Sequence, residues 1–203
     1  MKTMRNNLLA GLLFATSITL VSCSKDDPVP ELDQEVITEV TLTFTEIDNS
    51  GVSMGTSLEY VASSNEGIAL GGSLQIDDID GLESGKRYLM EISAYNGIAD
   101  EDITEEIEEE ADEHQFFFLG SAFTGSTSFM TYTYDDADEN NNPIGLVGQV
   151  TVDETLLSNT GQIRVILRHA LDKDYEGAEN PHWADYSQAG GESDLDITFD
   201  VTF

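Results

Sequence analysis

Apolar and polar residues alternate along most of the chain, which is the pattern of β-strands with one face in a core and the other in solvent. Val40, Leu42 and Phe44 occupy every second position near the start of this pattern. Residues 195–203 repeat it, with Asp194 on the polar face. About nine strands are predicted, from residue 36 to 45 and then over 58–62, 70–76, 87–95, 114–119, 129–134, 146–152, 162–169 and 195–203.

Turn residues separate these predicted strands at short intervals, for example at Asn49-Ser50-Gly51, Asp80-Gly81 and Asn96-Gly97. Short strands at this spacing predict one antiparallel, immunoglobulin-like β-sandwich over residues 36–203. The Cys…Trp…Cys core of antibody domains is absent from the sequence, so the similarity concerns architecture only.

One stretch interrupts the alternation and predicts a single short acidic helix. Ile103, Ile107 and Ala111 recur at every fourth position, which gives one narrow apolar stripe. Asp102 is placed to cap the N-terminus, with Glu105 as its capping-box partner.

The C-terminal end of this helix carries the wrong charge for the helix dipole. Glu109, Glu110 and Glu113 lie where the macrodipole is already negative, and His114 follows directly. A cation near this junction would relieve the repulsion. The next strand, 114–119, is apolar on both faces, so we expect it to be buried on both sides or covered by the preceding helix.

The first 22 residues predict a secretion signal. Lys2 and Arg5 precede an apolar stretch, 8–21, that is too short to span a bilayer. The following Leu-Val-Ser-Cys sequence resembles the lipobox of bacterial lipoproteins, which implies cleavage before Cys23 and lipidation of its thiol. The alternative is an ordinary signal peptide with an incidental cysteine. Cys23 is the only cysteine in the chain, so a disulfide within it is excluded.

The residues after Cys23 predict where the anchored protein lies. Ser24, Lys25, Asp26 and Asp27 resemble the export signal of Bacteroidota lipoproteins that are carried to the outer face of the outer membrane. We therefore expect a lipid-anchored protein of the outer membrane that faces the cell exterior. Residues 23–35 then form a polar, extended tether with too few apolar residues to fold alone.

Charge excludes one class of partner. Without residues 1–22 the chain keeps 40 acidic residues against six basic ones, a formal net charge of −34. Such a charge repels DNA, RNA and anionic lipid, which excludes nucleic-acid binding. Cations, basic surfaces and neutral ligands remain as partners.

Four motifs carry a family resemblance: EDITEEIEEEADEHQFFF, NNPIGL, VILRH and AGGESDLDITFDVTF. With the lipobox and SKDD they resemble a family of small Bacteroidota outer-membrane lipoproteins that is often labelled "type 1 periplasmic binding fold superfamily". The resemblance implies no established activity, but it implies an association with TonB-dependent uptake receptors. The label conflicts with the strand pattern, because a type 1 binding-protein fold needs repeated βαβ units.

The histidines and helix carboxylates predict a site for a first-row transition metal. His114 opens one strand and His169 closes another, so the two imidazoles approach each other if those strands are neighbours. Two histidines with Glu109, Glu110 or Glu113 would suit Zn²⁺ or a similar ion. The commoner explanation is a pair of hydrogen-bonded histidines at the ends of core strands.

A second cation site is suggested by the oxygen-rich loop 136–145. Asp136, Asp138, Asn140 and Asn142 place oxygen atoms on alternate residues, as in loops that wrap Ca²⁺. The bidentate acidic residue that would complete such a loop is replaced by Val147. A polar hairpin turn is the simpler interpretation, and we prefer it.

The long segment 171–192 is the third candidate site. It contains Tyr175, His182, Trp183 and Tyr186 between two predicted strands, and long loops are often functional. Its tryptophan, the only one in the chain, could stack on a ligand ring or pack against the sandwich.

Catalytic motifs are weak in this sequence. It contains no Gly-rich phosphate loop, no nucleophile elbow and no spacing that marks a catalytic triad. We therefore expect a non-enzymatic lipoprotein that binds a cation, such as Ca²⁺ or Zn²⁺, or a small ligand, as an accessory to a TonB-dependent receptor. The alternative is a structural or adhesive module that contacts a protein or glycan through the acidic helix and the Trp183 loop.

Overall fold

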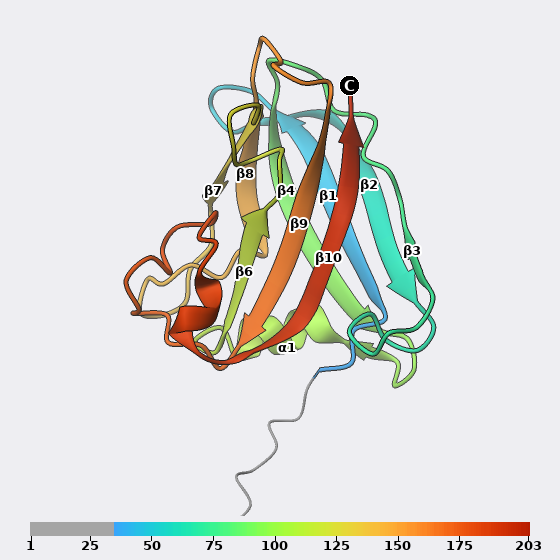
Figure 1. Cartoon of the computed structure of the whole chain (residues 1–203), viewed down its shortest axis with the longest axis vertical. Helices are drawn as coiled ribbons and strands as arrows, with labels where there is room; N and C mark the ends of the chain where they lie inside the picture. The colour runs from blue at the N-terminus through green and yellow to red at the C-terminus, as the bar shows by residue number, and fades with distance from the viewer. Residues whose placement is uncertain (1–34) are drawn as a thin grey trace, which may run out of the picture. The chain divides into compact units, whose positions relative to one another are not determined.

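Two antiparallel β-sheets pack face to face in the computed structural model, which describes residues 35–203 (Figure 1). The larger sheet has the strand order β3-β2-β1-β4-β8-β7, with β5 paired beside β4, and the smaller sheet has the order β10-β9-β6. The strands are β1 (Glu39–Ile47), β2 (Ser53–Ser64), β3 (Leu74–Ile76), β4 (Arg87–Asn96), β5 (Glu101–Asp102), β6 (His114–Leu119), β7 (Met130–Tyr134), β8 (Val147–Val152), β9 (Thr160–His169) and β10 (Glu192–Thr202).

The predicted mainly-β sandwich with one short acidic helix is confirmed. Its core lies between the sheets, where the inward residues of β1, among them Leu42 and Phe44, are fully buried. Burying one such side chain contributes roughly 1.5–3 kcal/mol to folding. Alternation therefore identified the strands because each has one face in this core.

Most strand boundaries differ from the prediction by a few residues, β2 is longer at both ends, and two further differences have a clear cause. The predicted strand 70–76 is reduced to β3, because Gly71 has a positive φ of 80° and the chain turns there. Leu70 is exposed, so its apolar character did not reflect burial. The two-residue strand β5 was not predicted, since two acidic residues show no strand pattern.

Helix α1 (Ile103–Glu109) lies across the lower end of the sandwich in Figure 1. As predicted, Asp102 caps it, and its side chain accepts a hydrogen bond from the Thr104 backbone N–H. The predicted apolar stripe is buried at Ile103 and Ile107. The Thr104 hydroxyl also bonds both backbone groups of Ala94 in β4, which fixes the position of the helix on the sheet.

Strand β6 is buried at all six positions, as expected. Its outer face is covered by the loop that follows β9 and not by α1. This loop contains the short 3-10 helix η1 (Tyr186–Ala189), seen at the lower left of Figure 1. Phe117 packs there in a second small core, whose other buried members are Leu119, Ile166, Leu171 and Ala189.

Both outer edges of the smaller sheet are hydrogen-bonded. On β6, the N–H groups of Phe116 and Phe118 donate to the carbonyl oxygens of Ile144 and Pro181, each at 2.7 Å. On β10, Ile79 forms a parallel bridge in which it exchanges hydrogen bonds of 2.8 Å with the backbone beside Val201. The short segments that carry Ile144 and Pro181 thus pair with the outer edge of β6, and Ile79 pairs with the C-terminal end of β10.

The predicted signal sequence, Cys23, Ser24–Asp27 and all of the predicted tether except Glu35 lie outside the described residues. Glu35 lies within them. Among residues 35–203, no helix is long and apolar enough to cross a membrane.

Candidate metal centre

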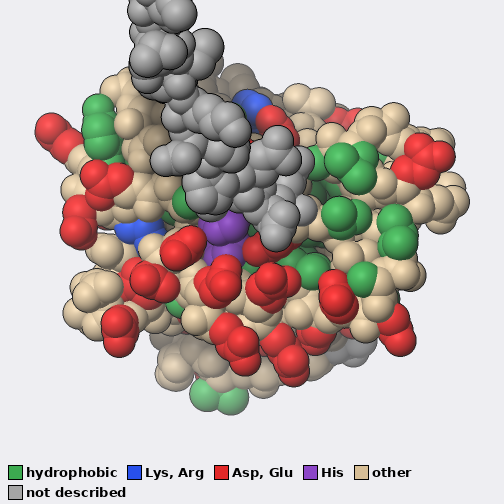
Figure 2. Space-filling view, turned by 90° about the horizontal axis from the view of Figure 1, so that it is seen from below, with side chains coloured by type: hydrophobic (Ala, Val, Ile, Leu, Met, Phe, Trp, Pro, Cys, Tyr) green, Lys and Arg blue, Asp and Glu red, His purple; other side chains and the backbone are tan. Residues whose placement is uncertain are grey.

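Four ionisable side chains converge at the end of the sandwich where α1 lies. They are Glu35 just before β1, His114 at the start of β6, His169 at the end of β9 and Asp194 near the start of β10. One ligand atom from each lies within 4.8 Å of the others. Viewed from below, histidine rings lie near the middle of this face among many carboxylates (Figure 2). We call these four residues the His/Glu/Asp cluster.

The two histidines meet because β6 and β9 are neighbours in register. His114 is the direct cross-strand partner of His169. Their rings stack with centroids 4.5 Å apart and planes 21° apart. The two strands are therefore neighbours, and the two imidazoles approach each other as expected for that case.

Asp194 enters the cluster through an irregularity in β10. The register between β10 and β9 shifts between Ser193 and Leu195, so that Asp194 and Leu195 are both buried. Strict alternation had placed Asp194 on the solvent face, and that prediction is wrong. Gly191 permits the shift, because it has a φ of 70° and a Cβ there would collide with the His169 carbonyl oxygen.

His114 is completely buried and has its two ring nitrogens in different surroundings. Nδ1 lies 3.1 Å from the carbonyl oxygen of Glu110, which can only accept, so Nδ1 carries a hydrogen. Nε2 lies 2.8 Å from Oε1 of Glu35, but the pair lacks the direction of a hydrogen bond. In the neutral ring, Nε2 therefore presents a lone pair towards a carboxylate. The two atoms repel each other unless a proton or another cation lies between them.

His169 repeats this arrangement with different partners. Nε2 lies 3.3 Å from Oε2 of Glu113, a half-exposed carboxylate at the end of the helix segment. Nδ1 lies 3.7 Å from Oδ2 of Asp194. If Nε2 donates to Glu113, Nδ1 presents its lone pair towards Asp194, just as Nε2 of His114 does towards Glu35.

The cluster contains most of the buried polar atoms that lack hydrogen-bond partners within residues 35–203. Five of eight such atoms belong to it, namely both carboxylate oxygens of Glu35, both of Asp194 and Nε2 of His114. The side chains of Glu35 and Asp194 are only 6% and 1% exposed. Buried carboxylates without partners are costly, so a positive charge in the cluster would stabilise these atoms.

The pKa values of the cluster show the same excess of negative charge. Burial alone would lower the pKa of His114, but the adjacent Glu35 carboxylate raises it overall. Burial and the charge of Glu35 raise the pKa of Asp194 to about 6, although both histidines act against this rise. The pocket thus favours any cation that can enter it.

Two imidazole nitrogens and two carboxylate oxygens match the ligand set of Zn²⁺ and other first-row divalent ions. Ligand atoms about 2.0–2.2 Å from one tetrahedral ion lie roughly 3.4 Å from each other. The spacing of 3.7 Å between His169 and Asp194 is close to this value, whereas the 2.8 Å between His114 and Glu35 would have to widen.

The helix carboxylates singled out by sequence occupy three different positions. Glu113 contacts His169 from outside the cluster. Glu110 bonds His114 through its backbone, and its side chain belongs to a second group with Glu35 and Glu106. Glu109 is exposed and faces a separate acidic hollow that Asp112 and Glu139 also line.

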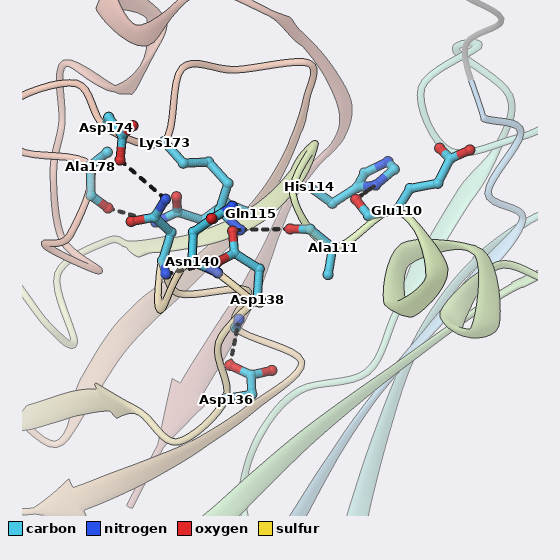
Figure 3. A network of polar contacts seen from close by, with 12 residues as sticks. Glu110, Ala111, His114, Gln115, Asp136, Asp138, Asn140, Lys173, Asp174 and Ala178 are labelled. Atoms are coloured by element: carbon cyan, nitrogen blue, oxygen red, sulfur yellow. Dashed lines mark hydrogen bonds and ion pairs between the residues drawn. The ribbon is translucent and has the colours of Figure 1, made fainter.

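The oxygen-rich loop is held by nitrogen donors (Figure 3). Oδ1 and Oδ2 of Asp136 accept from the backbone N–H groups of Gly145 and Val147. Oδ1 of Asp138 accepts from the backbone of Asn140 and Asn142, and its Oδ2 lies 3.1 Å from Nζ of the buried Lys173. The ammonium of Lys173 thus provides a positive charge beside Asp138, and the Asp136 oxygens are occupied by backbone donors, as the preferred hairpin-turn interpretation requires.

The aromatic residues of loop 171–192 pack against the protein. Trp183 lies edge-on to Phe117 and stacks on Tyr175, with centroids 6.2 and 5.6 Å apart. Tyr186 stacks on Phe117 at 5.8 Å. His182 lies apart from the other histidines, where its Nδ1 is 2.6 Å from the carbonyl oxygen of Phe118. These residues form a cover for β6.

Sequence reasoning missed two members of the cluster. Glu35 was assigned to the tether because it follows a polar, proline-containing segment. Asp194 was assigned to a solvent face. The signal for Asp194 was the Gly190-Gly191 pair just before the strand, since such pairs mark bulges and close backbone approaches.

The chain was compared with protein-family models, with curated proteins and with solved structures, and no match was found in any of the three comparisons.

Proposed function

We propose that this protein is a non-enzymatic, lipid-anchored protein that binds a divalent transition-metal ion at Glu35, His114, His169 and Asp194. The observation that carries the proposal is the orientation of the two histidines. Each directs one nitrogen to an acceptor in the 110–113 segment and the other to a buried carboxylate of the cluster. This is the outer-shell pattern that prepares an imidazole for metal binding.

The location proposed for this function comes from the sequence. The lipobox-like segment at Cys23 would attach the protein to the outer membrane, and Ser24–Asp27 would direct it to the outer face. At the cell surface the excess of acidic residues would concentrate cations near the cluster. We propose that the bound ion is passed to a TonB-dependent receptor, in keeping with the family resemblance.

The adhesive alternative has less support. It needs Trp183 and its neighbours to be free for a partner, whereas Trp183 and Tyr186 pack on Phe117. We retain it only as the interpretation that a failed metal experiment would favour.

The test is the thermal stability of the full chain, purified in detergent and stripped with chelator. A ligand that binds only the folded state at 100 times its Kd stabilises by about 2.7 kcal/mol, so Zn²⁺ should raise the melting temperature by several degrees. The shift should disappear in the His114→Ala and His169→Ala variants. It should persist in His182→Ala, a matched control in which the third histidine of the chain is removed.

An absence of any shift with Zn²⁺, Co²⁺, Fe²⁺ and Cu²⁺ would overturn the metal proposal. A shift that survives removal of both cluster histidines would place the metal elsewhere on the acidic surface.

A further inference from the structure

The carboxylate of Glu35 belongs to two groups of side chains at once. One is the His/Glu/Asp cluster, and the other consists of Glu35, Glu106 and Glu110. In each group, one ligand atom per residue lies within 4.8 Å of the others. Glu35 therefore stands between a histidine-containing group and a group made of carboxylates alone.

The two helix carboxylates reach Glu35 because they share one face of the helix end. Glu106 and Glu110 are four residues apart, and the Glu110 N–H still donates to the Glu106 carbonyl oxygen at 2.9 Å. Residues at this spacing lie one above the other on a helix. The hydrogen bonds between Thr104 and Ala94 hold this helix against β4 and so fix the direction of that face.

This arrangement is unfavourable unless a cation is added. Like charges four residues apart on a helix repel each other even in solvent. Here one carboxylate oxygen each of Glu106 and Glu110 lies within 4.8 Å of an oxygen of the buried Glu35. Three carboxylates have therefore been brought together with no Lys or Arg ion pair to any of them among the described residues.

Glu35 supplies an observation that is independent of acidity. Its side chain is 94% buried, since only 6% is exposed, and neither of its oxygens has a hydrogen-bond partner. Oε1 faces Nε2 of His114 at 2.8 Å, so a single ion on the histidine side would engage that oxygen and leave Oε2 unsatisfied. A carboxylate with both oxygens buried and unpaired can bridge two ions.

We propose that the centre is dinuclear, with the Glu35 carboxylate bridging the ion held by His114, His169 and Asp194 to a second divalent cation held by Glu106 and Glu110. This inference rests on the proposed function, because the first ion is the one proposed there. In two-metal centres the ions lie about 3.5–4 Å apart, which is a separation that one bridging carboxylate spans.

The two positions differ in chemistry. The first offers two nitrogens and suits Zn²⁺, whereas the second offers only carboxylate oxygen and suits harder ions such as Mn²⁺ as well. Glu106 and Glu110 are exposed, so water molecules complete the coordination of the second ion. The second ion therefore binds more weakly and fills after the first.

The experiment titrates Zn²⁺ into the chelator-stripped full chain in detergent and measures binding by calorimetry. The buffer contains about 0.15 M salt, which limits the range of general charge effects to about 8 Å. Two equivalents should bind, the second at least tenfold more weakly. The double variant Glu106→Gln/Glu110→Gln should bind one equivalent, with the Kd of the tight site changed by less than threefold. Glu35→Gln should weaken both sites by at least tenfold.

The matched control is Glu105→Gln/Glu109→Gln. It removes the same charge at the same spacing from exposed positions of the same helix, and it should retain both equivalents. A second measurement uses Mn²⁺, because two ions bridged by one carboxylate give an exchange-coupled electron paramagnetic resonance spectrum. The melting temperature of each variant without metal shows that it is folded.

The outcomes are distinct. One equivalent in the unmodified protein, or two equivalents in Glu106→Gln/Glu110→Gln, would overturn the dinuclear proposal and leave the single-ion function intact. Loss of the second equivalent in the control variant would also overturn it, because general charge would then explain the second ion. No binding at all would overturn the proposed function itself.

Discussion

His114 and His169 stack directly opposite each other at the ends of β6 and β9, and each has a buried carboxylate beside the ring nitrogen that faces into the cluster. Two neighbouring imidazoles that both became charged would repel each other in this dry pocket. An ion with two positive charges, bound as proposed, would remove that conflict and would neutralise Glu35 and Asp194 at the same time. The predictions that follow separate this arrangement from a purely structural pair of histidines.

Replacing Asp194 should change stability and metal response in opposite directions. Asp194→Asn removes a buried charge without hydrogen-bond partners, so the metal-free protein should become more stable by about 1–3 kcal/mol. The stabilisation by Zn²⁺ should fall, because one ligand loses its charge. Urea denaturation at about pH 8, with and without Zn²⁺, measures both effects.

The control for this change is Asp196→Asn, two residues along on the exposed face. Asp196 pairs with Arg164, so its loss should lower stability slightly and leave the response to Zn²⁺ unchanged. A metal-free Asp194→Asn protein that is less stable than the unmodified one would show that Asp194 is already satisfied by the histidines.

Glu113 and Glu109 test the role of the helix end. Glu113 lies 3.3 Å from Nε2 of His169, so Glu113→Gln should weaken the Zn²⁺ Kd by about 10-fold to 100-fold, as for other groups that orient a ligand. Glu109→Gln removes an equal charge from an exposed position and should change the Kd by less than about twofold. If both variants changed the Kd equally, Glu113 would act only through its charge and not by orienting His169.

The buried pair of Lys173 and Asp138 should stabilise the oxygen-rich loop. Nζ of Lys173 lies 3.1 Å from Asp138 and donates to the Ala111 carbonyl oxygen at 2.7 Å. Asp138→Asn should therefore cost about 3–5 kcal/mol, because it leaves a buried ammonium without its counter-charge. Asp138→Asn/Lys173→Met should cost less than either single change, as a double-mutant cycle in urea will show.

The same pair predicts part of the acid sensitivity of the protein. Burial opposes ionisation of Asp138, but the Asn142 N–H and the Lys173 ammonium lower its pKa overall. Its contribution to stability is therefore present above the ordinary carboxyl pKa of about 3.9 and is lost as pH falls through the lower folded value. The double variant should lose less stability than the unmodified protein over this range.

Trp183 should report on the cover of β6. Trp183→Ala removes its contacts with Phe117 and Tyr175 and should cost about 2–3 kcal/mol, less than for a fully buried tryptophan. Binding of Zn²⁺ should not change, because the cover lies on the other face of the strand. An unchanged stability would indicate that the loop is loosely attached.

Cys23 provides the test of anchoring. Cys23→Ser removes the thiol that the lipobox resemblance marks for lipidation, so the protein should move from the membrane to the soluble fraction. Surface accessibility to added protease in intact cells tests the export signal separately. A Cys23→Ser protein that stays in the membrane would contradict the lipoprotein assignment.

Sequence reasoning identified the elements whose pattern has a direct physical cause. The core strands alternate because each has one face in the core, and α1 begins at Asp102 because that side chain satisfies the Thr104 N–H. The pairing of His114 with His169 was anticipated because both lie at strand ends. Whether the strands were neighbours depended on long-range register, which no local pattern contains.

The two missed residues show where such reasoning stops. Asp194 is turned inwards by a one-residue shift in register, and a shift of this size reverses which side chain faces the core. Glu35 lies in irregular chain before β1, where no periodicity predicts burial. The pairing of Lys173 with Asp138 joins distant parts of the sequence, so no local pattern could predict that a lysine lies beside this carboxylate.

The backbone pairing at the outer edges of the smaller sheet affects how copies of the protein could associate. An open strand edge invites a strand of another molecule to add to it, and this is a common route to aggregation. On β6, Ile144 and Pro181 already accept from the outward N–H groups of Phe116 and Phe118, and on β10 Ile79 occupies the groups beside Val201. The β6 edge, where His114 lies, is thereby made less open to the addition of a strand from another copy.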